Sequence, residues 1–320
     1  MSVRISATAL MVAALTAAWP CAAAEPAPVQ ADVGLRSDRT VVLAAQRAGT
    51  RAVAVGERGA VFVSGDGGAT WHGRRVSSTR TLTSVIALDE LNWIAAGHGG
   101  VLFRSQDGGE SWNAVAGDWG TDSFIGLTSV DDHTVLAYGA FGILLRSTDA
   151  GRTWTRSHVI DDDFDRHINR IVVLANTDLL LLGESGAIAR SSDGGQTFAA
   201  LESPYGGSFF GGMQTASGSL LIFGMRGRVY RSDDSGKTWH PAEIKTEIPF
   251  FGGTSLGNGT VVLSGNAGWI ATSRDDGRSF GLEKVGGKGI SGVFERPDHV
   301  VVGFGAQGLR PLPAIIGERL

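Results

Sequence analysis

Ser64-Gly65-Asp66-Gly67-Gly68-Ala69-Thr70-Trp71 is a stretch that the chain repeats. The pattern S-x-D-x-G-x-[ST]-[WF] returns five more times, beginning at Ser105, Ser147, Ser191, Ser232 and Ser273. Its closing aromatic residue recurs at intervals of 41 to 44 residues. Self-similarity at a fixed period of this size is typical of solenoids, propellers and repeat arrays.

A second pattern, G-x-x-G, precedes each Asp motif and occurs seven times, from Gly56/Gly59 to Gly305/Gly308. Short apolar or alternating runs lie between these marks, and Gly and Asp bound them, as expected for strands. In the second unit we expect strands at residues 82–88, 93–96, 101–105 and 112–115. Four strands in a unit of about 40 to 45 residues describe a propeller blade.

The seventh unit lacks the Asp motif, and its third strand runs into Pro311 and Pro313. We expect its missing strand to come from the N-terminal side, near residues 29–35, because pairing the two chain ends would remove an exposed sheet edge. The predicted fold is therefore all-β, with one seven-bladed β-propeller of four-stranded antiparallel blades over residues 25–320.

Residues 1–24 have the features of a secretory signal peptide. Arg4 is followed by an apolar run over residues 7–19 and by Ala22-Ala23-Ala24, so we expect cleavage after Ala24. The single cysteine, Cys21, lies in this segment, which leaves the predicted mature chain without a disulfide. We expect a periplasmic or secreted protein without stable membrane insertion.

The composition argues against several classes of function. With 28 Lys and Arg against 32 Asp and Glu, the net charge is −4, which provides no electrostatic footprint for nucleic acid. We found no Walker loop, Ser–His–Asp signature or metal-ligand spacing, so the prediction includes no cofactor, no metal and no catalytic residue. We expect a monomer.

Positions that recur in every blade are most simply structural. The acids of the Asp motif should bind backbone N–H groups of their own turns, and the closing aromatic rings should be buried between blades. These residues are Asp66, Asp107, Asp149, Asp193, Asp234 and Asp275, with Trp71, Trp112, Trp154, Phe198, Trp239 and Phe280. The arginines before the motif, Arg104, Arg146, Arg190 and Arg231, are interpreted in the same way.

The first strand of each blade should begin fifteen residues before the G-x-x-G turn, at an apolar core position occupied by Val41 in the first blade. Two residues later the chain has glycine in four blades, which suggests crowding where the innermost strands converge. Arg170 breaks that pattern.

Loops on the face opposite the Asp motifs should carry function, because loops on a rigid scaffold commonly do. Its aromatic residues could form an apolar mouth for a protein partner. The candidate partner-binding residues are Arg58, His98, Trp119, His167, Asn169, Arg170, Tyr205, Phe210, Arg226 and Phe251. The acidic run at residues 161–165 is interpreted as a solvated loop, since it lacks the ligand spacing of a calcium loop.

The combination of S-x-D-G-G-x-T-W with G-x-x-G-x-[VIL]-x-R-S resembles the Asp-box, or bacterial neuraminidase repeat, class. More closely, it resembles the photosystem II stability and assembly factor-like propellers, and the resemblance covers residues 43–309. It implies a non-enzymatic scaffold that assists assembly of a membrane or envelope complex, in some bacteria in association with exporters. Nothing in the residues themselves indicates photosynthesis.

The Asp-box class also contains glycoside hydrolases, so a sialidase-like enzyme is the alternative. The chain has no Arg-Ile-Pro motif, and only Tyr205 among its three tyrosines lies outside a repeated blade position. Hydrolysis by two carboxylates requires a defined separation between them. Asp163, Asp165, Glu184 and Glu247 are the residues from which such a pair would come.

Overall fold

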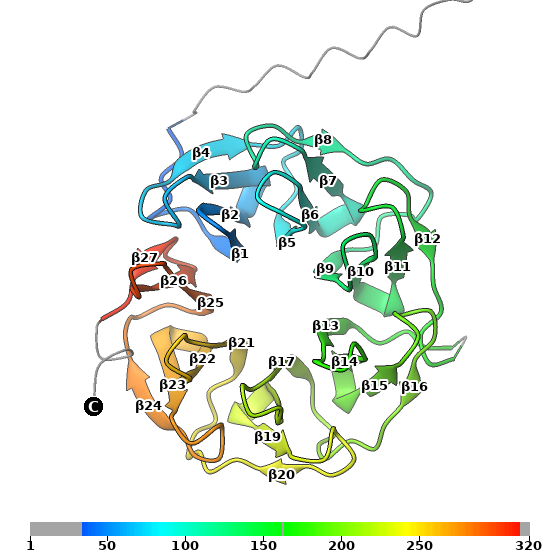
Figure 1. Cartoon of the computed structure of the whole chain (residues 1–320), viewed down its shortest axis with the longest axis vertical. Helices are drawn as coiled ribbons and strands as arrows, with labels where there is room; N and C mark the ends of the chain where they lie inside the picture. The colour runs from blue at the N-terminus through cyan, green and yellow to red at the C-terminus, as the bar shows by residue number, and fades with distance from the viewer. Residues whose placement is uncertain (1–33, 162, 314–320) are drawn as a thin grey trace, which may run out of the picture.

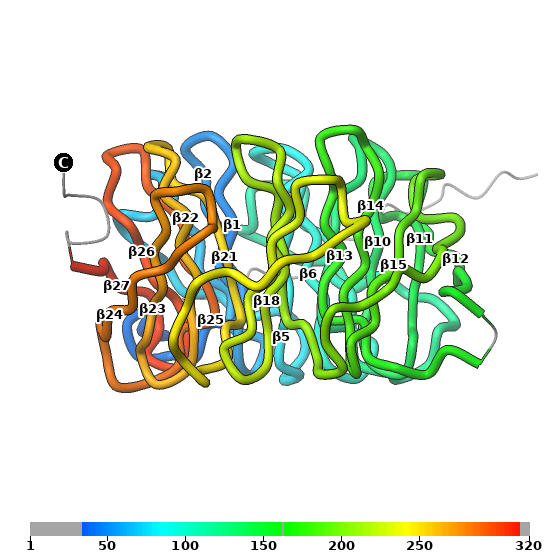
Figure 2. Tube along the Cα trace, turned by 90° about the horizontal axis from the view of Figure 1, so that it is seen from below, coloured from blue at the N-terminus to red at the C-terminus, as the bar shows by residue number. Residues whose placement is uncertain are grey.

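Seven antiparallel sheets stand around a central opening in the computed structural model, which describes residues 34–161 and 163–313. Strands follow one another in chain order within each sheet, with the first strand innermost and the last at the rim (Figure 1). Seen from the side, the strands run between two faces of a disc (Figure 2). The predicted seven-bladed propeller is confirmed.

Each blade is defined by its strands. The first three blades consist of β1 (Val42–Ala48), β2 (Arg51–Gly56), β3 (Ala60–Ser64), β4 (His72–Arg75), β5 (Leu82–Ala87), β6 (Trp93–Gly97), β7 (Leu102–Ser105), β8 (Asn113–Ala114), β9 (Phe124–Ser129), β10 (Val135–Gly139), β11 (Leu144–Ser147) and β12 (Thr155–Arg156). The next two consist of β13 (Ile168–Val173), β14 (Leu179–Gly183), β15 (Ile188–Ser191), β16 (Ala199–Ala200), β17 (Phe209–Gln214), β18 (Leu220–Gly224), β19 (Val229–Ser232) and β20 (His240–Pro241). The last two consist of β21 (Phe250–Ser255), β22 (Val261–Gly265), β23 (Trp269–Ser273), β24 (Gly281–Lys284), β25 (Ile290–Glu295), β26 (Val301–Gly305) and β27 (Arg310–Pro311).

The G-x-x-G marks form short 3₁₀ turns between the second and third strands of six blades. Their bounds are Glu57–Gly59, His98–Gly100, Ala140–Gly142, Glu184–Gly186, Met225–Gly227 and Asn266–Gly268. No helix among the described residues is long and apolar enough to cross a membrane.

The core lies between blades. Second strands such as β6 are buried along their whole length, because neighbouring blades cover both of their faces. The described residues form seven apolar clusters, one at each contact between adjacent blades. The cluster that closes the ring joins Phe304 of the last blade to Phe62 and Val42 of the first. Burial between neighbours stabilises the ring, as in other repeat folds.

One predicted core position is wrong by a residue. In the second blade the buried core residue is Leu82, which pairs with Gly97 fifteen residues later, as predicted. In the first blade the buried residue that pairs with Gly56 is Val42, fourteen residues earlier, and not Val41. The reason is a tighter turn: Arg47 pairs with Ala52 and encloses four residues, while the corresponding pair in the second blade, Ala87 and Trp93, encloses five. The first blade is therefore one residue shorter at this point.

The ring closure predicted for residues 29–35 is described only in part. The last sheet has three strands among the described residues, and of the predicted strand only residues 34 and 35 are described, neither in a strand. Leu35 packs against the cluster that closes the ring, and the Ser37 carbonyl accepts a hydrogen bond from Leu309 N at 2.7 Å. The predicted signal peptide lies outside the described residues.

Candidate binding site in the central channel

The Asp-motif turns bind their own acids internally. Ser64 Oγ donates to Asp66 Oδ1 at 2.7 Å and accepts from Gly68 N at 2.8 Å, while Thr70 Oγ1 donates to Asp66 Oδ2 at 2.6 Å. In the other five motifs, the Ser or Thr hydroxyl four residues after the aspartate also donates to its carboxylate. These aspartates are Asp107, Asp149, Asp193, Asp234 and Asp275. Aspartate bonding of this kind is a turn device, so these carboxylates are engaged within the turns.

The electrostatic consequence is a low pKa. Partial burial raises the pKa of Asp149, Asp193 and Asp275, but hydroxyl and backbone hydrogen bonds from their own turns outweigh it, and the pKa falls to about 2. The Thr70 hydroxyl is the largest influence on Asp66, whose pKa also lies well below its usual range. Acids held ionised in this way are poor proton donors near neutral pH.

The closing aromatic residues pack between blades, as predicted. Trp71 donates from Nε1 to Gly68 O and lies edge-on to Phe294 of the last blade, with ring centroids 6.3 Å apart. Trp112 and Phe198 belong in the same way to clusters shared with the preceding blade.

The arginines before the motif link neighbouring blades at the rim. Arg104 Nε donates to Ala150 O, and Arg146 Nε donates to Gly194 O, each across a blade boundary. Arg190 reaches Ser235 O, and Arg231 reaches Asp276 O. The structural interpretation of these four residues is confirmed.

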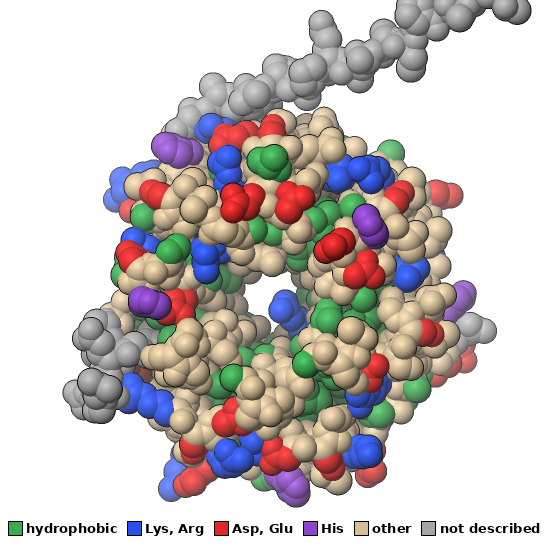
Figure 3. All heavy atoms as spheres, viewed as in Figure 1, with side chains coloured by type: hydrophobic (Ala, Val, Ile, Leu, Met, Phe, Trp, Pro, Cys, Tyr) green, Lys and Arg blue, Asp and Glu red, His purple; other side chains and the backbone are tan. Residues whose placement is uncertain are grey.

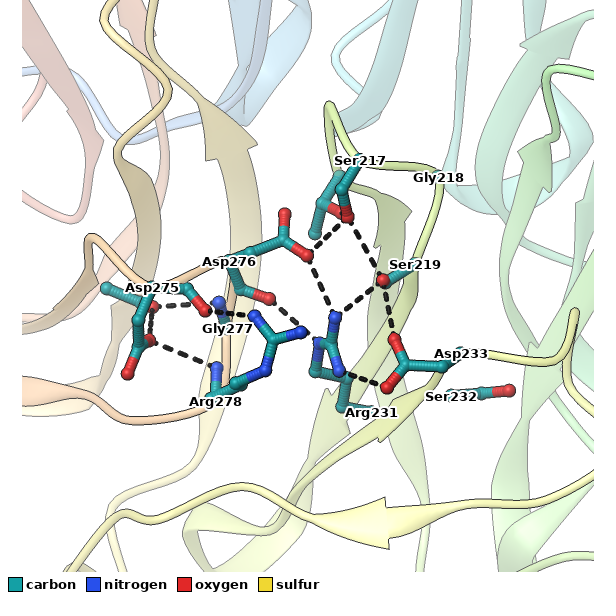
Figure 4. Close-up of polar contacts among 12 residues, drawn as sticks. Ser217, Gly218, Ser219, Arg231, Ser232, Asp233, Asp275, Asp276, Gly277 and Arg278 are labelled. Atoms are coloured by element: carbon teal, nitrogen blue, oxygen red, sulfur yellow. Dashed lines mark hydrogen bonds and ion pairs between the residues drawn. The ribbon is translucent and has the colours of Figure 1, made fainter.

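Arg231 has the densest set of contacts (Figure 4). The residue is 7% exposed and forms ion pairs with Asp233 and with Asp276, the latter at 2.9 Å from the next blade. Ser219 accepts a further hydrogen bond from its guanidinium at 2.7 Å. This cluster holds the fifth and sixth blades together, and each guanidinium nitrogen of Arg231 donates to a partner within it.

Two predicted contact residues are covered. Trp119 is 8% exposed, donates from Nε1 to Gly100 O at 2.8 Å and packs against Phe124. Tyr205 is half-buried and stacks on Tyr230, with ring centroids 6.4 Å apart. Trp119 is therefore a packing residue, not an exposed anchor, and Tyr205 is largely committed to its own blade.

Three other predicted residues are exposed at the G-x-x-G turns. Arg58 and Arg226 occupy the left-handed position of their turns, at φ 53° and 52°, and His98 lies at the start of its turn. Phe141 takes the same left-handed position at φ 52° and is 60% exposed. These turns join the second and third strands of their blades, so they lie further from the channel than the innermost strands.

His167 lies in a small cluster on the same face. Its ring stands edge-on to Phe141 at 5.2 Å, and its Nδ1 lies 3.4 Å from Glu184 Oε2. That carboxylate also accepts a hydrogen bond from His167 N at 3.1 Å, just as Glu57 accepts one from Val41 N in the first blade. Glu184 therefore supports the start of an inner strand.

No described residues bring three or more His, Cys, Asp or Glu side chains together in a way that could hold a metal ion. Of the acidic run at residues 161–165, Asp162 lies outside the described residues.

The inner strands enclose a channel of about 630 Å³. Figure 3 shows the opening and a Lys or Arg side chain within it. Among the described residues that line it, Arg170 is the only charged one, and none is a carboxylate. Volumes of this size are common for ligand sites.

A bulge at the start of each inner strand places one residue of variable type toward this channel. Thr83 and Asn169 occupy it in two blades and donate hydrogen bonds, each at 2.8 Å, to Phe124 O and Phe209 O of the next blade. Phe210 and Phe251 occupy it in the fifth and sixth blades, with ring centroids 5.8 Å apart. Phe251 is 40% exposed. The structure thus brings Asn169, Arg170, Phe210 and Phe251 onto consecutive inner strands.

The glycines beside this bulge have a local cause. A Cβ on Gly126, Gly211 or Gly292 would lie 2.3 to 2.4 Å from the ring of Tyr138, Phe223 or Phe304 on the neighbouring strand. The predicted crowding therefore comes chiefly from an aromatic ring within the same blade. Sequence reasoning missed these three rings, although each immediately precedes a G-x-x-G turn in a blade that has this glycine.

The fold and channel define the class: a seven-bladed β-propeller with four-stranded antiparallel blades. No protein-family model matches the sequence, and no curated protein matches it. The chain is similar to a structure described as YCF48 bound to D1 peptide, at 16% identity and a TM-score of 0.69 over 86% of this chain and 91% of that one. It is also similar to YCF48 from Cyanidioschyzon merolae, at 13% identity and a TM-score of 0.70 over 86% and 96%.

An ancestral GH74 enzyme is similar as well, at 12% identity and a TM-score of 0.67 over 86% of this chain and 44% of that one. At such identities the likeness establishes the propeller fold. It is shared by binding proteins and by an enzyme, so function has to be argued from the residues of this chain.

Proposed function

We propose that this chain is an exported, non-enzymatic propeller that binds a protein partner, as an assembly or accessory factor of an envelope complex. The observation that carries the proposal is the channel mouth, where Phe210 and Phe251 lie 5.8 Å apart on a face whose turns expose Arg58, His98 and Phe141. Exposed aromatic side chains ringed by polar groups are typical anchors of protein interfaces.

The carboxylates support the same proposal. A glycosidase needs two that converge on one substrate, yet the described channel lining has none, and Glu184 accepts the His167 N–H. The acids with the lowest pKa lie in the Asp-motif turns, bound within the turns themselves. The similar structure described as YCF48 bound to D1 peptide indicates that a propeller of this kind can bind a peptide.

The test is capture from an envelope extract by the wild-type protein and two variants. Phe210→Ala/Phe251→Ala removes the aromatic pair. Leu91→Ala is the matched control, because Leu91 is an exposed apolar residue, 53% exposed, in a β5–β6 turn on the opposite face. We expect one protein to be retained by wild type and by Leu91→Ala and lost by the double variant. Equal retention by all three would place the site elsewhere.

Export has a separate test. Intact mass and N-terminal sequencing of protein recovered from an envelope fraction should show a chain that begins at Glu25. Recovery of an uncleaved chain from the cytoplasm would contradict export but would not affect the proposal of a binding site at the channel mouth.

A further inference from the structure

Arg170 is out of place among the residues that occupy its position in the other blades. Arg170 pairs with Leu182, the residue just before the G-x-x-G turn on the second strand of its blade. The first-strand residues that pair with this position in three other blades are Ser84, Gly126 and Gly211. In the remaining blades the position is Ala44, Gly252 and Gly292. One long cationic side chain therefore stands in a ring of small residues.

The neighbours leave the guanidinium unsatisfied. The Arg170 side chain is exposed, and its guanidinium forms no hydrogen bond or ion pair with any other residue that the structure describes. Glycine on both adjacent blades, Gly126 and Gly211, offers no side chain to meet it. Asn169, the polar neighbour on its own strand, already donates to Phe209 O. Up to five N–H donors thus face the channel unused.

The channel also lacks a compensating charge. Among the described lining residues there is no Asp or Glu, so the guanidinium provides a single positive charge within walls that are otherwise neutral. Such a wall weakens screening by water and strengthens attraction of an anion. The guanidinium fork matches a carboxylate in shape.

Apolar surface lies beside this charge. Phe210 precedes Gly211, the residue that aligns with Arg170 on the neighbouring inner strand, and Phe251 follows one blade further on, with the two rings 5.8 Å apart. A ligand held by Arg170 would therefore have an aromatic surface within the same mouth. One cation next to aromatic rings suits a single carboxylate attached to an apolar group.

We propose that the channel is a binding site for a monocarboxylate that carries an apolar or aromatic group, with Arg170 holding the carboxylate and Phe210 and Phe251 holding the apolar part. This chemistry has two sources: a free organic acid, or the C-terminus of a polypeptide that ends in an apolar residue. The second source rests on the proposed function, since it makes the carboxylate the end of the bound protein.

The test measures binding of four probes to the full purified protein by calorimetry: 3-phenylpropionate, its neutral amide, the peptide Gly-Gly-Phe, and the same peptide with an amidated C-terminus. We expect each acid to bind at least about tenfold more tightly than its amide, because a charge-assisted hydrogen bond is lost in the amide. Preference for the peptide acid over phenylpropionate would identify a chain terminus as the source, and the reverse preference a free acid.

Variants separate the charge from the fold. Arg170→Gln should abolish the preference for acids, and Arg170→Lys should retain part of it. Arg156→Gln is the matched control, since Arg156 is exposed on the rim strand β12 and its loss changes the net charge equally. Tm of each variant verifies that the protein is folded.

Three results would overturn the inference: equal binding of acid and amide, an acid preference that survives in Arg170→Gln, or no binding of any probe. The proposed function fails separately. If a protein is captured through Phe210 and Phe251 while acid and amide bind equally, the partner is bound without its carboxylate. If the acids bind and no protein is captured, the channel is a small-ligand site.

Discussion

Arg231 and Arg170 show two opposite uses of the same side chain in one ring. At the rim, Arg231 is buried between the fifth and sixth blades and pairs with Asp233 and Asp276. In the channel, Arg170 is exposed and has no partner among the described residues. Burying a charge is costly unless it is paired, so the first arginine is part of the scaffold. The guanidinium of Arg170 is therefore available to bind a ligand.

The largest difference should appear in stability. Arg231→Ala leaves the carboxylates of Asp233 and Asp276 unpaired beside Ser219, and we expect unfolding free energy to fall by about 2 to 3 kcal/mol. Arg170→Ala removes an unpaired exposed group and should change it by less than about 0.5 kcal/mol. Urea denaturation of both variants verifies this. Similar losses in the two would mean that Arg170 also has a structural role.

A smaller loss is expected where aromatic rings crowd the inner strands. Gly211→Ala would place a Cβ 2.4 Å from the ring of Phe223, which is almost fully buried. We expect a loss of about 1 to 3 kcal/mol, because overpacking forces the ring to move. Gly206→Ala is the control, since a Cβ there meets nothing within 4 Å and no positive φ is recorded for it. Gly211→Ala/Phe223→Leu should recover part of the loss if the ring is the cause.

The smallest effect concerns pH and the Asp-motif face. In the folded protein the pKa of Asp149, Asp193 and Asp275 is about 2, below the ordinary value of a free aspartate. These ionised carboxylates therefore stabilise the fold fully above that ordinary value, and this stabilisation disappears as pH falls toward 2. The urea midpoint should hold between pH 7 and about 5 and then decline.

Asp193→Asn separates this contribution from the general effect of acid. The variant weakens the bonds from Thr197 and should lower the midpoint at pH 7, while its decline in acid should be less steep. An unchanged acid slope would show that Asp193 does not contribute to it.

The sequence predicts the ring well because its signals are local and repeated. The period locates seven blades, and the second unit's expected strands agree with β5 to β8 within one or two residues. Recurrence alone predicts a structural role for the arginines that precede four of the six Asp motifs, and their hydrogen bonds across blade boundaries agree with it. The prediction of Val41 is wrong because it counts a constant fifteen residues back from G-x-x-G, and the turn between the first two strands of this blade is one residue shorter.

The site was harder to predict because it depends on contacts between residues far apart in the chain. Trp119 stands in a polar loop, yet its indole reaches the Gly100 carbonyl and is buried. The Phe210–Phe251 pair joins residues one blade apart, which no local pattern reveals. Arg170 was visible as a break in a repeated position, but only the structure shows that the lining around it has no carboxylate among its described residues.

The most direct test of the proposed function is photo-crosslinking from the channel mouth. A photoreactive amino acid is placed at Phe210, and in a second protein at Leu91 on the opposite face, and both are irradiated in intact envelopes. We expect one discrete protein adduct from position 210 and none from position 91. Adducts from position 91 alone, or the same adducts from both positions, would contradict a partner site at the channel mouth.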